Sequence, residues 1–433
     1  MLMHTEKYYL THDWTETSFS KLCDISRGAS PRPINDWTVK SGIPWVKISD
    51  ASEAKSRYIE RTEEYIKAEG RSRSVEVFPG DLILSNSASP GIPKFMKIGA
   101  CIHDGWLLLR NFRNLDKLFA YYLLIQERPA LIRQGNGSVF TNLKTDILKN
   151  HIVRLPPLPE QRAIAHILGT LDDKIELNRC MNETLESMAR AFFKSWFVDF
   201  DPVRAKAEGR DTGLPKEIAD LFPDGFEDSE LGEIPRGWEV VPIGEIANIV
   251  GGSTPSTKEL AFWKDGDHCW ATPKDLSRLS TPVLLETERK ITHEGLSQIG
   301  SGLLPAGTVL LSSRAPIGYL AISEVPTSIN QGFIAMLPAK EVSNLFILYW
   351  AEWAHEEIVS RANGSTFLEI SKANFRQILV IRPVKTIMEL FESKVRPLYL
   401  QIVKNEQESL NLSSLRSSLL PKLLSGEVRV HNL

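Results

Sequence analysis

Two short stretches carry residue types that metal-dependent nucleases use, a glutamate and a lysine two positions apart. They are Glu53-Ala54-Lys55 and Glu392-Ser393-Lys394. A carboxylate at such a place could hold a metal ion, and the lysine could stabilise developing negative charge. However, Glu53 has no acidic residue on a well-spaced neighbouring strand, and the second pair falls within a predicted helix. We therefore interpret both pairs as solvated surface charges.

Motifs that bind nucleotides or methyl donors are missing from the sequence. There is no Gly-Lys dipeptide for a Walker A loop, no Gly-x-Gly-x-x-Gly and no Asn-Pro-Pro-aromatic motif. The histidines show no metal-ligand spacing, and the cysteines at 23, 101, 180 and 269 form no Cys-x-x-Cys pair. Widely spaced cysteines of this kind suit a reducing cytosol. No apolar run approaches the roughly 18 residues of a membrane span.

Two loops rich in glycine and hydroxyl groups are better candidates for contact with a ligand. The first is Gly28-Ala29-Ser30-Pro31-Arg32-Pro33, and the second runs Gly251-Gly252-Ser253-Thr254-Pro255-Ser256-Thr257-Lys258. Neither is a P-loop, because no Gly-Lys-Ser or Gly-Lys-Thr follows. Each loop is either a structural turn or a contact to a nucleic-acid backbone, and the local sequence alone leaves both interpretations open.

These loops belong to an internal repeat of domain size. Near the start of the chain a shift of 224 positions superimposes the two copies, and further along the shift becomes 227. So constant a shift indicates duplication rather than a short solenoid repeat. The matched residues include Trp14 with Trp238, Gly28 with Gly252, Gly80 with Gly307, Gly105 with Gly332, and Phe119 with Phe346.

Each copy ends in a long stretch with the heptad spacing of a coiled-coil seam. The predicted helices cover about 159–198 and 386–425, and each would be about 60 Å long at 1.5 Å per residue. Pro397 and Pro421 predict a kink or an early stop in the second helix. The first seam comprises Ile164, Leu168, Leu171, Ile175, Asn178, Asn182, Leu185, Ala189, Phe192 and Trp196; the second comprises Phe391, Val395, Leu398, Ile402, Asn405, Ser409, Leu412, Arg416, Leu419 and Leu423.

Asn178 and Asn405 occupy equivalent seam positions close to the midpoints of these helices. In an antiparallel pair only residues near the midpoint meet their own equivalents. We therefore predict that the two amides face each other, hydrogen-bond reciprocally and fix the register. The alternative is that one or both asparagines point to solvent.

Composition and patterning predict an α+β protein. Its two similar mixed α/β globular domains would be joined by two long helices that form an antiparallel coiled coil, with pseudo-two-fold internal symmetry. The chain has 433 residues and a net charge of −3; residues 1–155 sum to +5 and residues 199–239 to −7. A helix over 115–132 should be interrupted near Pro129, and a short helix is expected over 216–222. The predicted boundaries are 1–155 for the first globular domain, 156–200 for the central helix, 201–237 for an acidic linker, 238–382 for the second globular domain, and 383–433 for the C-terminal helix and tail.

The helix start Leu155-Pro156-Pro157-Leu158-Pro159-Glu160-Gln161-Arg162 and the tract Trp196-Phe197-Val198-Asp199-Phe200-Asp201-Pro202 resemble the specificity subunits of type I restriction–modification enzymes. So do Gly232-Glu233-Ile234-Pro235-Arg236-Gly237-Trp238 and the Leu-Leu-Ser-Gly-Glu ending. The second helix departs from the pattern, because it opens Arg382-Pro383-Val384-Lys385-Thr386-Ile387-Met388-Glu389 without the Pro-Pro-Leu-Pro-Glu-Gln-Arg tract.

The resemblance implies a cytoplasmic, non-catalytic subunit that serves in defence against phage. Each globular domain would be a target recognition domain reading one half of a bipartite, asymmetric site in double-stranded DNA. The helices would dock two adenine-methyltransferase subunits, and motor–nuclease subunits would add ATP-dependent cleavage. The chain itself would hold no cofactor, because S-adenosylmethionine, ATP and magnesium would bind the partner subunits. Partner and coiled-coil contacts are expected at Leu158, Glu160, Gln161, Arg162, Ile164, Leu168, Leu171, Ile175, Asn178, Leu398, Ile402, Asn405 and Leu412.

Two other functions remain open from the residues alone: a stand-alone DNA methyltransferase or nuclease with a duplicated DNA-binding region, and a pure coiled-coil scaffold. The missing catalytic motifs disfavour the first, and two globular domains of about 150 residues disfavour the second. The candidate DNA contacts are loop cations and hydroxyls, namely Arg27, Ser30, Arg32, Lys47 and Lys94 in the first copy, and Thr254, Thr257, Lys258, Lys274 and Arg314 in the second.

Overall fold

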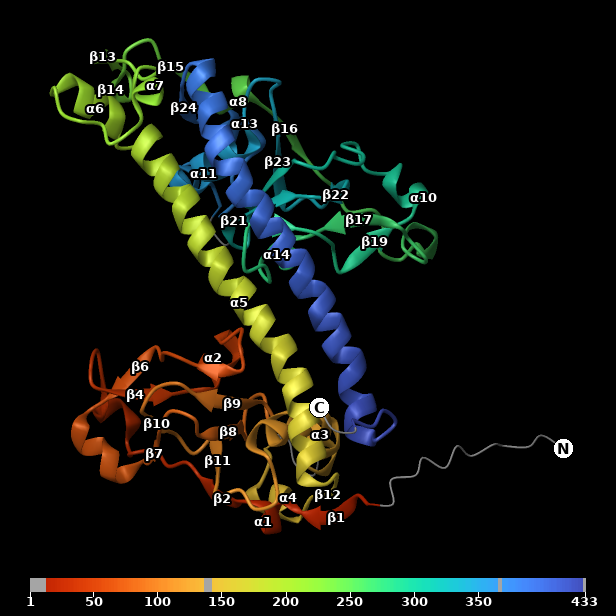
Figure 1. Cartoon of the computed structure of the whole chain (residues 1–433). Coiled ribbons are helices and arrows are strands. Elements are labelled where there is room, and N and C mark those ends of the chain that lie inside the picture. Colours follow the sequence, from red (N-terminus) through yellow and green to blue (C-terminus); the bar gives the residue numbers. More distant parts are fainter. Residues whose placement is uncertain (1–12, 136–141, 365–367, 431–433) are drawn as a thin grey trace. The chain divides into compact units, whose positions relative to one another are not determined.

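The computed structural model describes residues 13–135, 142–364 and 368–430. It divides into two compact units, one of residues 1–177 with 409–433, and one of residues 178–408. Each unit is therefore built from a globular part together with portions of both long helices (Figure 1). In the described residues no helix is both long and apolar enough to cross a membrane.

The first unit contains two five-stranded sheets and a two-stranded pair. The strand orders are β3-β6-β4-β10-β7, β2-β11-β8-β9-β5 and β1-β12. The strands are β1 Thr15–Ser18, β2 Asp24–Arg27, β3 Thr38–Val39, β4 Ile43–Val46, β5 Tyr58–Ile59, β6 Glu64–Ile66, β7 Val75–Val77, β8 Leu82–Ser85, β9 Pro93–Met96, β10 Ala100–Ile102, β11 Trp106–Arg110 and β12 Ile152–Leu155. The helices are α1 Phe19–Leu22, α2 Ile48–Glu53, α3 Lys117–Gly135 and α4 Thr145–Asn150, with 3-10 turns at Ile34–Asp36 and Ala68–Arg73.

The second unit repeats this plan. Its sheet β16-β23-β20-β21-β18 matches β2-β11-β8-β9-β5, and its sheet β19-β17-β22 matches the inner strands β6-β4-β10. The strands are β15 Glu239–Pro242, β16 Ala247–Gly251, β17 His268–Ala271, β18 Val283–Leu284, β19 Arg289–Ile291, β20 Val309–Ser313, β21 Ile317–Ser323, β22 Thr327–Ile329, β23 Phe333–Pro338 and β24 Leu379–Arg382. The helices are α8 Ile243–Ile246, α9 Pro273–Leu276, α10 His293–Leu296, α11 Asn344–Trp353, α12 His355–Ser360 and α13 Lys372–Arg376, with a 3-10 turn at Leu260–Phe262.

The segment between the two copies forms small elements that pack on the second unit. They are α6 Asp201–Ala207, α7 Lys216–Ala219 and the hairpin β13 Phe226–Ser229 with β14 Gly232–Pro235. Phe200, Val203 and Phe222 are buried in the same core cluster as Trp238. The short helix expected over 216–222 is therefore present, and the acidic segment is anchored by its aromatic residues.

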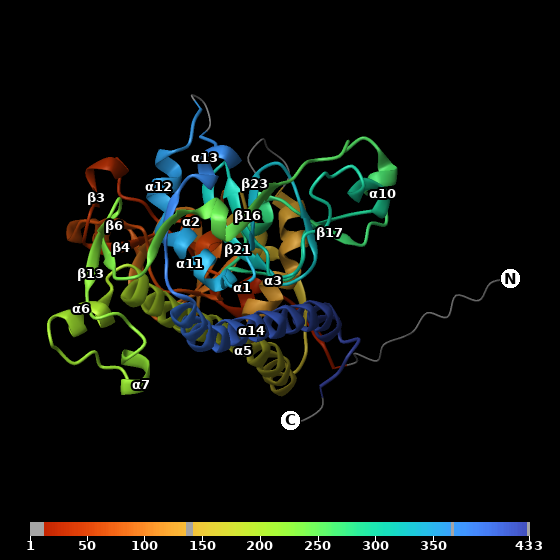
Figure 2. The ribbon, with the colours of Figure 1, turned by 90° about the horizontal axis from the view of Figure 1, so that it is seen from above.

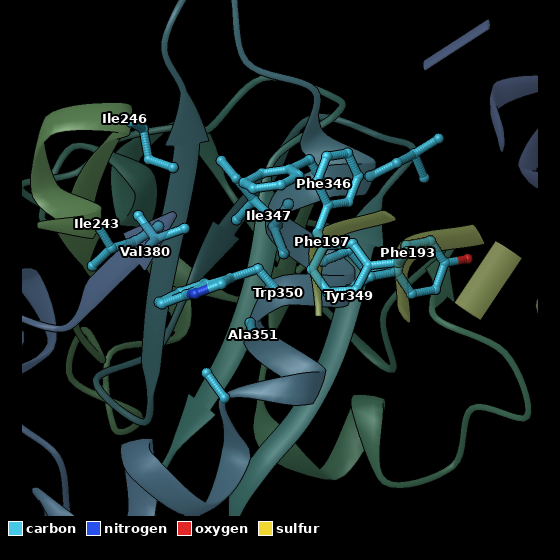
Figure 3. Close-up of a cluster of buried hydrophobic side chains, with 14 of the residues drawn as sticks. Phe193, Phe197, Ile243, Ile246, Phe346, Ile347, Tyr349, Trp350, Ala351 and Val380 are labelled. Atoms are coloured by element: carbon cyan, nitrogen blue, oxygen red, sulfur yellow. The ribbon is translucent and has the colours of Figure 1, made fainter. Parts of the chain in front are cut away.

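The core of the second unit joins helix to sheet through aromatic contacts (Figure 3). Phe197 contacts Phe346 and Phe391 edge-to-face, with ring centroids 5.1 Å apart in both pairs. Such pairs add to the gain from apolar burial. Tyr349 and Trp350, from α11, belong to the same buried cluster. The end of α5 and the start of α14 are thereby fixed to the sheet domain.

Both long helices form as the heptad pattern predicts, and every predicted seam residue is buried or partly buried. They are α5 Leu158–Phe197 and α14 Lys385–Ser425, which lie side by side in both views (Figures 1 and 2). In the second unit Phe197 near the end of α5 contacts Phe391 near the start of α14. In the first unit Asp172 of α5 pairs with Arg416 of α14. The helices are therefore antiparallel in each unit.

The predicted interruption near Pro129 was wrong, and so was an early stop at Pro397 or Pro421, whereas a kink at these last two prolines stays a prediction. Pro129 lies inside the continuous helix α3, and Pro397 and Pro421 lie inside the continuous helix α14. In α3 the flanking residues Leu124 and Leu131 are fully buried, and their packing holds the helix through the missing hydrogen bond. The copy of α3 breaks at Ala354, between α11 and α12, although no proline is present there.

The polar centre of the seam differs from the predicted amide pair. Asn178 Nδ2 donates to the main-chain oxygen of Asn405 at 3.3 Å and to Glu408 at 2.9 Å. The amide partner of Asn405 is Asn182, whose Oδ1 accepts from Asn405 Nδ2 at 2.7 Å. Asn182 in turn donates to Glu406 at 2.8 Å. The asparagines meet across the seam, but the reciprocal Asn178–Asn405 amide pair was wrong.

In this register Asn182 lies opposite Glu406 and Phe197 opposite Phe391, so the position of α5 that would meet its own repeat equivalent lies about two residues beyond Asn178. The midpoint of a helix depends on where it frays, whereas register depends on side-chain packing and on which polar groups find partners. Asn178, Asn182 and Asn405 are all at most 2% exposed. Their hydrogen bonds therefore discriminate strongly between registers.

We predict that replacing Asn405 by leucine destabilises the second unit by on the order of 1–3 kcal/mol, because Asn182 loses its buried donor. Equilibrium unfolding followed by tryptophan fluorescence measures this loss. Gln407→Leu, on the same helix but exposed, is the matched control. Equal stability of the two variants would show that the buried amides contribute nothing to the pairing.

Candidate nucleic-acid interface

The first candidate loop lies against a turn of the same unit. Gly28 follows β2, and its backbone N–H donates to the Trp106 carbonyl oxygen at 2.9 Å. A Cβ atom on Gly28 would lie 2.1 Å from the His103 carbonyl oxygen, so only glycine fits this approach. Beside it, Ser30 Oγ donates to Asp104 Oδ1 at 2.6 Å. We call residues 28–33 with the turn 103–105 the first loop–turn site.

The second candidate loop is built in the same way. A Cβ on Gly252 would lie 1.8 Å from the Ile329 carbonyl oxygen. Thr254 Oγ1 donates to Gln331 Oε1 at 2.5 Å, which repeats the Ser30–Asp104 hydrogen bond at the equivalent positions. We call residues 252–258 with the turn 330–332 the second loop–turn site.

The two turns are also stabilised by equivalent hydrogen bonds. The Gly105 N–H donates to His103 Nδ1, and the Gly332 N–H donates to Asn330 Oδ1, both at 2.8 Å. His103 must keep Nδ1 unprotonated to accept this bond. Burial favours that state, because it lowers the pKa of His103 below its usual value. The repeat therefore preserves a backbone scaffold while exchanging the side chains displayed on it.

Each loop continues into a 3-10 turn that is followed by a tryptophan. In the second unit Trp263 Nε1 donates to the Ser256 carbonyl oxygen at 2.9 Å, which closes the loop. The Arg289 guanidinium carbon lies 3.8 Å from the centroid of the Trp263 ring. In the first unit Trp37 has Arg73 at 5.0 Å over its ring. Each loop therefore lies beside an arginine held over an aromatic ring by cation–π attraction.

Six of the ten predicted DNA contacts belong to these loops or directly adjoin them. Arg27, Ser30 and Arg32 all contact Asp104. Thr254, Thr257 and Lys258 are exposed on the second loop. The cations Arg27 and Arg32 have side chains that are 58% and 73% exposed, so both are available to a ligand.

The remaining surface candidates lie elsewhere in the two units. Lys47 precedes α2 and pairs with Glu64 at 2.6 Å. Lys274 on α9 pairs with Glu288 at 3.1 Å. Arg314 pairs with Glu369 at 3.5 Å. These cations have acidic partners within their own unit, and their contact with DNA stays a prediction.

Lys94 is buried, so its predicted contact with DNA was wrong. Its ammonium group donates to the carbonyl oxygens of Ala54 at 2.6 Å and Ser56 at 2.5 Å. It is only 7% exposed, and burial lowers its pKa to about 8. A lysine in strand β9 points either inward or outward, and the sequence pattern did not reveal that this one is inward.

Glu160 and Gln161 are also unavailable as partner contacts. Glu160 accepts from Trp14 Nε1 at 3.3 Å and pairs with Arg429 at 2.6 Å. Gln161 Nε2 donates to the carbonyl oxygens of Asn114 and Pro156, at 3.1 and 3.0 Å. The expected partner role of these two residues was wrong, because both are buried within the first unit.

Their equivalents explain why the second helix lacks the Pro-Pro-Leu-Pro-Glu-Gln-Arg tract. A shift of 227 positions takes Glu160 to Ile387 and Gln161 to Met388, which are 0% and 4% exposed. Both pairs lie where the helix joins its globular domain. The first junction is polar and the second apolar, so the missing tract reflects packing within the chain.

Two groups were missed by sequence reasoning, the acceptors Asp104 and Gln331. They fall on each other at the repeat shift of 227, directly before the matched Gly105 and Gly332. That equivalence was the available signal. Only the fold shows that these acceptors meet the loops, which lie more than seventy residues away in sequence. Among the described residues no group of His, Cys, Asp or Glu could hold a metal ion.

A duplicated sheet domain that displays a polar loop–turn site in each copy, beside paired helices, defines a duplicated recognition protein. The sequence matches the type I restriction modification DNA specificity domain family twice, over residues 11–187 and 235–411. The chain belongs to that family.

Named relatives agree over nearly the whole length. The HindI specificity subunit of Haemophilus influenzae is 26% identical, with 96% of this chain and all of the relative covered. The MjaIX specificity subunit of Methanocaldococcus jannaschii is also 26% identical, with 97% and 95% covered. The crystal structure of the S subunit from M. genitalium shares the fold, with a TM-score of 0.58 at 16% identity over 95% of this chain and 96% of that one.

We predict that replacing Lys94 by methionine removes a pH dependence of stability. The folded pKa is about 8 against a usual 10.5, so between these values the unfolded chain binds more protons. Wild-type stability should therefore rise with pH across this window, relative to the variant, by on the order of 3 kcal/mol. Denaturant unfolding at pH 7.5 to 10.5 measures the difference. A constant difference between the two proteins would contradict the buried charge.

Proposed function

We propose that this chain is the DNA-recognition subunit of a type I restriction–modification complex and reads a bipartite, asymmetric site in double-stranded DNA. The observation that carries the proposal is the pair of loop–turn sites. They share a backbone scaffold but differ in displayed charge: arginines with an aspartate in the first, and hydroxyls with a glutamine in the second. Different side chains on one scaffold suit two different half-sites.

Adenine methylation and ATP-dependent cleavage belong to partner subunits in this proposal. S-adenosylmethionine, ATP and magnesium would bind those partners, and this chain would supply recognition alone. A near-neutral net charge of −3 fits a subunit whose partners share in neutralising DNA phosphates. The proposed half-site readers are residues 1–155 and 238–382. The proposed central helix is 156–200, the acidic linker is 201–237, and 383–433 is the C-terminal helix with its tail.

Docking of methyltransferase subunits has a candidate surface on the outer faces of the helices. Met188 in the second unit and Leu415 in the first are equivalent at the shift of 227, and each is 46% exposed. An apolar side chain that stays exposed in both copies suits two copies of one partner. We propose that each marks the docking site of one methyltransferase subunit, and that motor–nuclease subunits join this core.

Replacing residues 238–382 with the corresponding domain of another family member should change one half of the methylated site and leave the other half intact. The reason is that each domain carries its own loop–turn site. Sequencing of the host methylome, with and without this gene, measures the site. A change in both halves, or in neither, would overturn the assignment of half-sites to domains.

The rival function is a stand-alone methyltransferase or nuclease. The control for it is purified chain, free of partner subunits, incubated with DNA, methyl donor, ATP and magnesium. Methylation or cleavage under these conditions would favour the rival. Restoration of methylation only when the methyltransferase subunit is added supports the recognition role.

Each of the single variants Met188→Glu and Leu415→Glu should lose one bound methyltransferase subunit. The double variant should bind none. Burial of one such side chain contributes about 1.5–3 kcal/mol, so affinity at each site should fall at least about tenfold. Native mass spectrometry of the mixed subunits counts the copies bound. Leu231→Glu, 47% exposed on the β13–β14 hairpin, is the control, and two methyltransferases on the double variant would refute the assignment.

A further inference from the structure

The Asp104 residue contacts the three candidate DNA-binding side chains in and next to the first loop–turn site, Arg27, Ser30 and Arg32. Asp104 Oδ1 accepts from Ser30, while Asp104 Oδ2 lies 3.3 Å from an Arg32 nitrogen and 3.8 Å from an Arg27 nitrogen. The Asp104 main-chain oxygen accepts from Arg27 Nε at 2.8 Å and from Asn86 Nδ2 at 3.1 Å. The hydrogen bond from Ser30, then a backbone N–H hydrogen bond and the charge of Arg32, hold the pKa of Asp104 below its usual value. The Asp104 carboxylate is therefore negatively charged in the protein before DNA binds.

The second copy exchanges the whole charge set. Gln331 replaces Asp104, Gly251 replaces Arg27 and Ser256 replaces Arg32, while the hydrogen bond from the loop hydroxyl is kept. The carboxylate is thus present in the copy that has two arginines and absent in the copy without them. The hydroxyl needs only a neutral acceptor, as Gln331 demonstrates. The negative charge of Asp104 therefore concerns the arginines rather than the folding of the loop.

We propose that Asp104 is a specificity-determining positioning residue of the first recognition site, and this rests on the proposed function. By holding Arg27 and Arg32 it withholds two exposed cations from indiscriminate contact with DNA phosphates. An exposed ion pair is weak, so a well-placed bidentate contact to a guanine edge outcompetes it. On DNA that lacks the target sequence, a phosphate close to the arginines is also close to the Asp104 carboxylate, which repels it. Asp104 thereby lowers the affinity for non-specific DNA more than the affinity for the target site.

The distinguishing variant is Asp104→Asn, which keeps an Oδ1 acceptor for Ser30 and removes the charge. In the assembled complex with its methyltransferase subunits, affinity for DNA lacking the site should rise about threefold to tenfold. Affinity for the target should stay equal or fall, so that specificity drops about tenfold. For non-specific DNA, the slope of log affinity against log salt concentration should become more negative by about one to two. Each arginine released to contact a phosphate contributes about 0.9 to this slope.

Two further variants separate this role from general electrostatics. Glu53→Gln removes an exposed carboxylate from the same unit and should leave specificity and salt slope unchanged. Combining Asp104→Asn with Arg27→Gln and Arg32→Gln should abolish the gain on non-specific DNA, because the released cations are gone. Equal effects of Glu53→Gln and Asp104→Asn would overturn the proposal, and so would a gain that survives loss of both arginines.

Methylation by the wild-type complex separates the role of Asp104 from the proposed function of the whole chain. If the wild-type complex methylates no bipartite site, the proposed function fails. If it methylates such a site and Asp104→Asn changes neither affinity ratio nor salt slope, the proposed function stands and the role of Asp104 is refuted. Methylome sequencing of an Asp104→Asn strain gives an independent readout. New methylated sites should be degenerate in only one half.

Discussion

The antiparallel seam between α5 and α14 is the constraint on which both units depend. Because the helices run in opposite directions, the end of each packs with the start of the other. The first unit is completed by residues 409–433, and the second begins at residue 178, within the first long helix. Leu423 and Leu424 are buried with Ile164 and Leu168, while Phe391 and Val395 are buried with Phe193 and Phe197. The first unit is therefore made of two separate stretches of sequence, and the second is one continuous stretch that begins inside the first long helix.

The middle of this seam is polar where a bundle would ordinarily be apolar. Buried asparagines contribute little stability compared with leucines of similar volume, but they penalise every register that leaves an amide without a partner. The chain uses them at Asn178, Asn182 and Asn405, with Glu406 and Glu408 as acceptors. Because each buried amide needs a partner, the seam favours one alignment of two helices that are 40 and 41 residues long.

The loop–turn sites show how duplication permits divergence. The close approach of Gly28 and Gly252 to neighbouring main-chain oxygens fixes the loop in both copies. The hydrogen bonds within the two turns are likewise equivalent. With the backbone settled by these contacts, the displayed residues are free to differ. Recognition then depends on side-chain chemistry that selection can alter without refolding the domain.

The sequence by itself determined the repeat, the long helices and the chemistry that is missing, because periodicity and fixed shifts are visible along one dimension. It also placed Ser30 and Thr254 in loops, since glycine and proline mark such turns. Tertiary structure alone decided that Lys94 points inward, that Glu160 and Gln161 serve a domain junction, and that α3 continues through Pro129. The pairings of Ser30 with Asp104 and of Asn405 with Asn182 also required the fold. Each of these depends on which distant groups supply burial or a hydrogen-bond partner, and local sequence does not specify them.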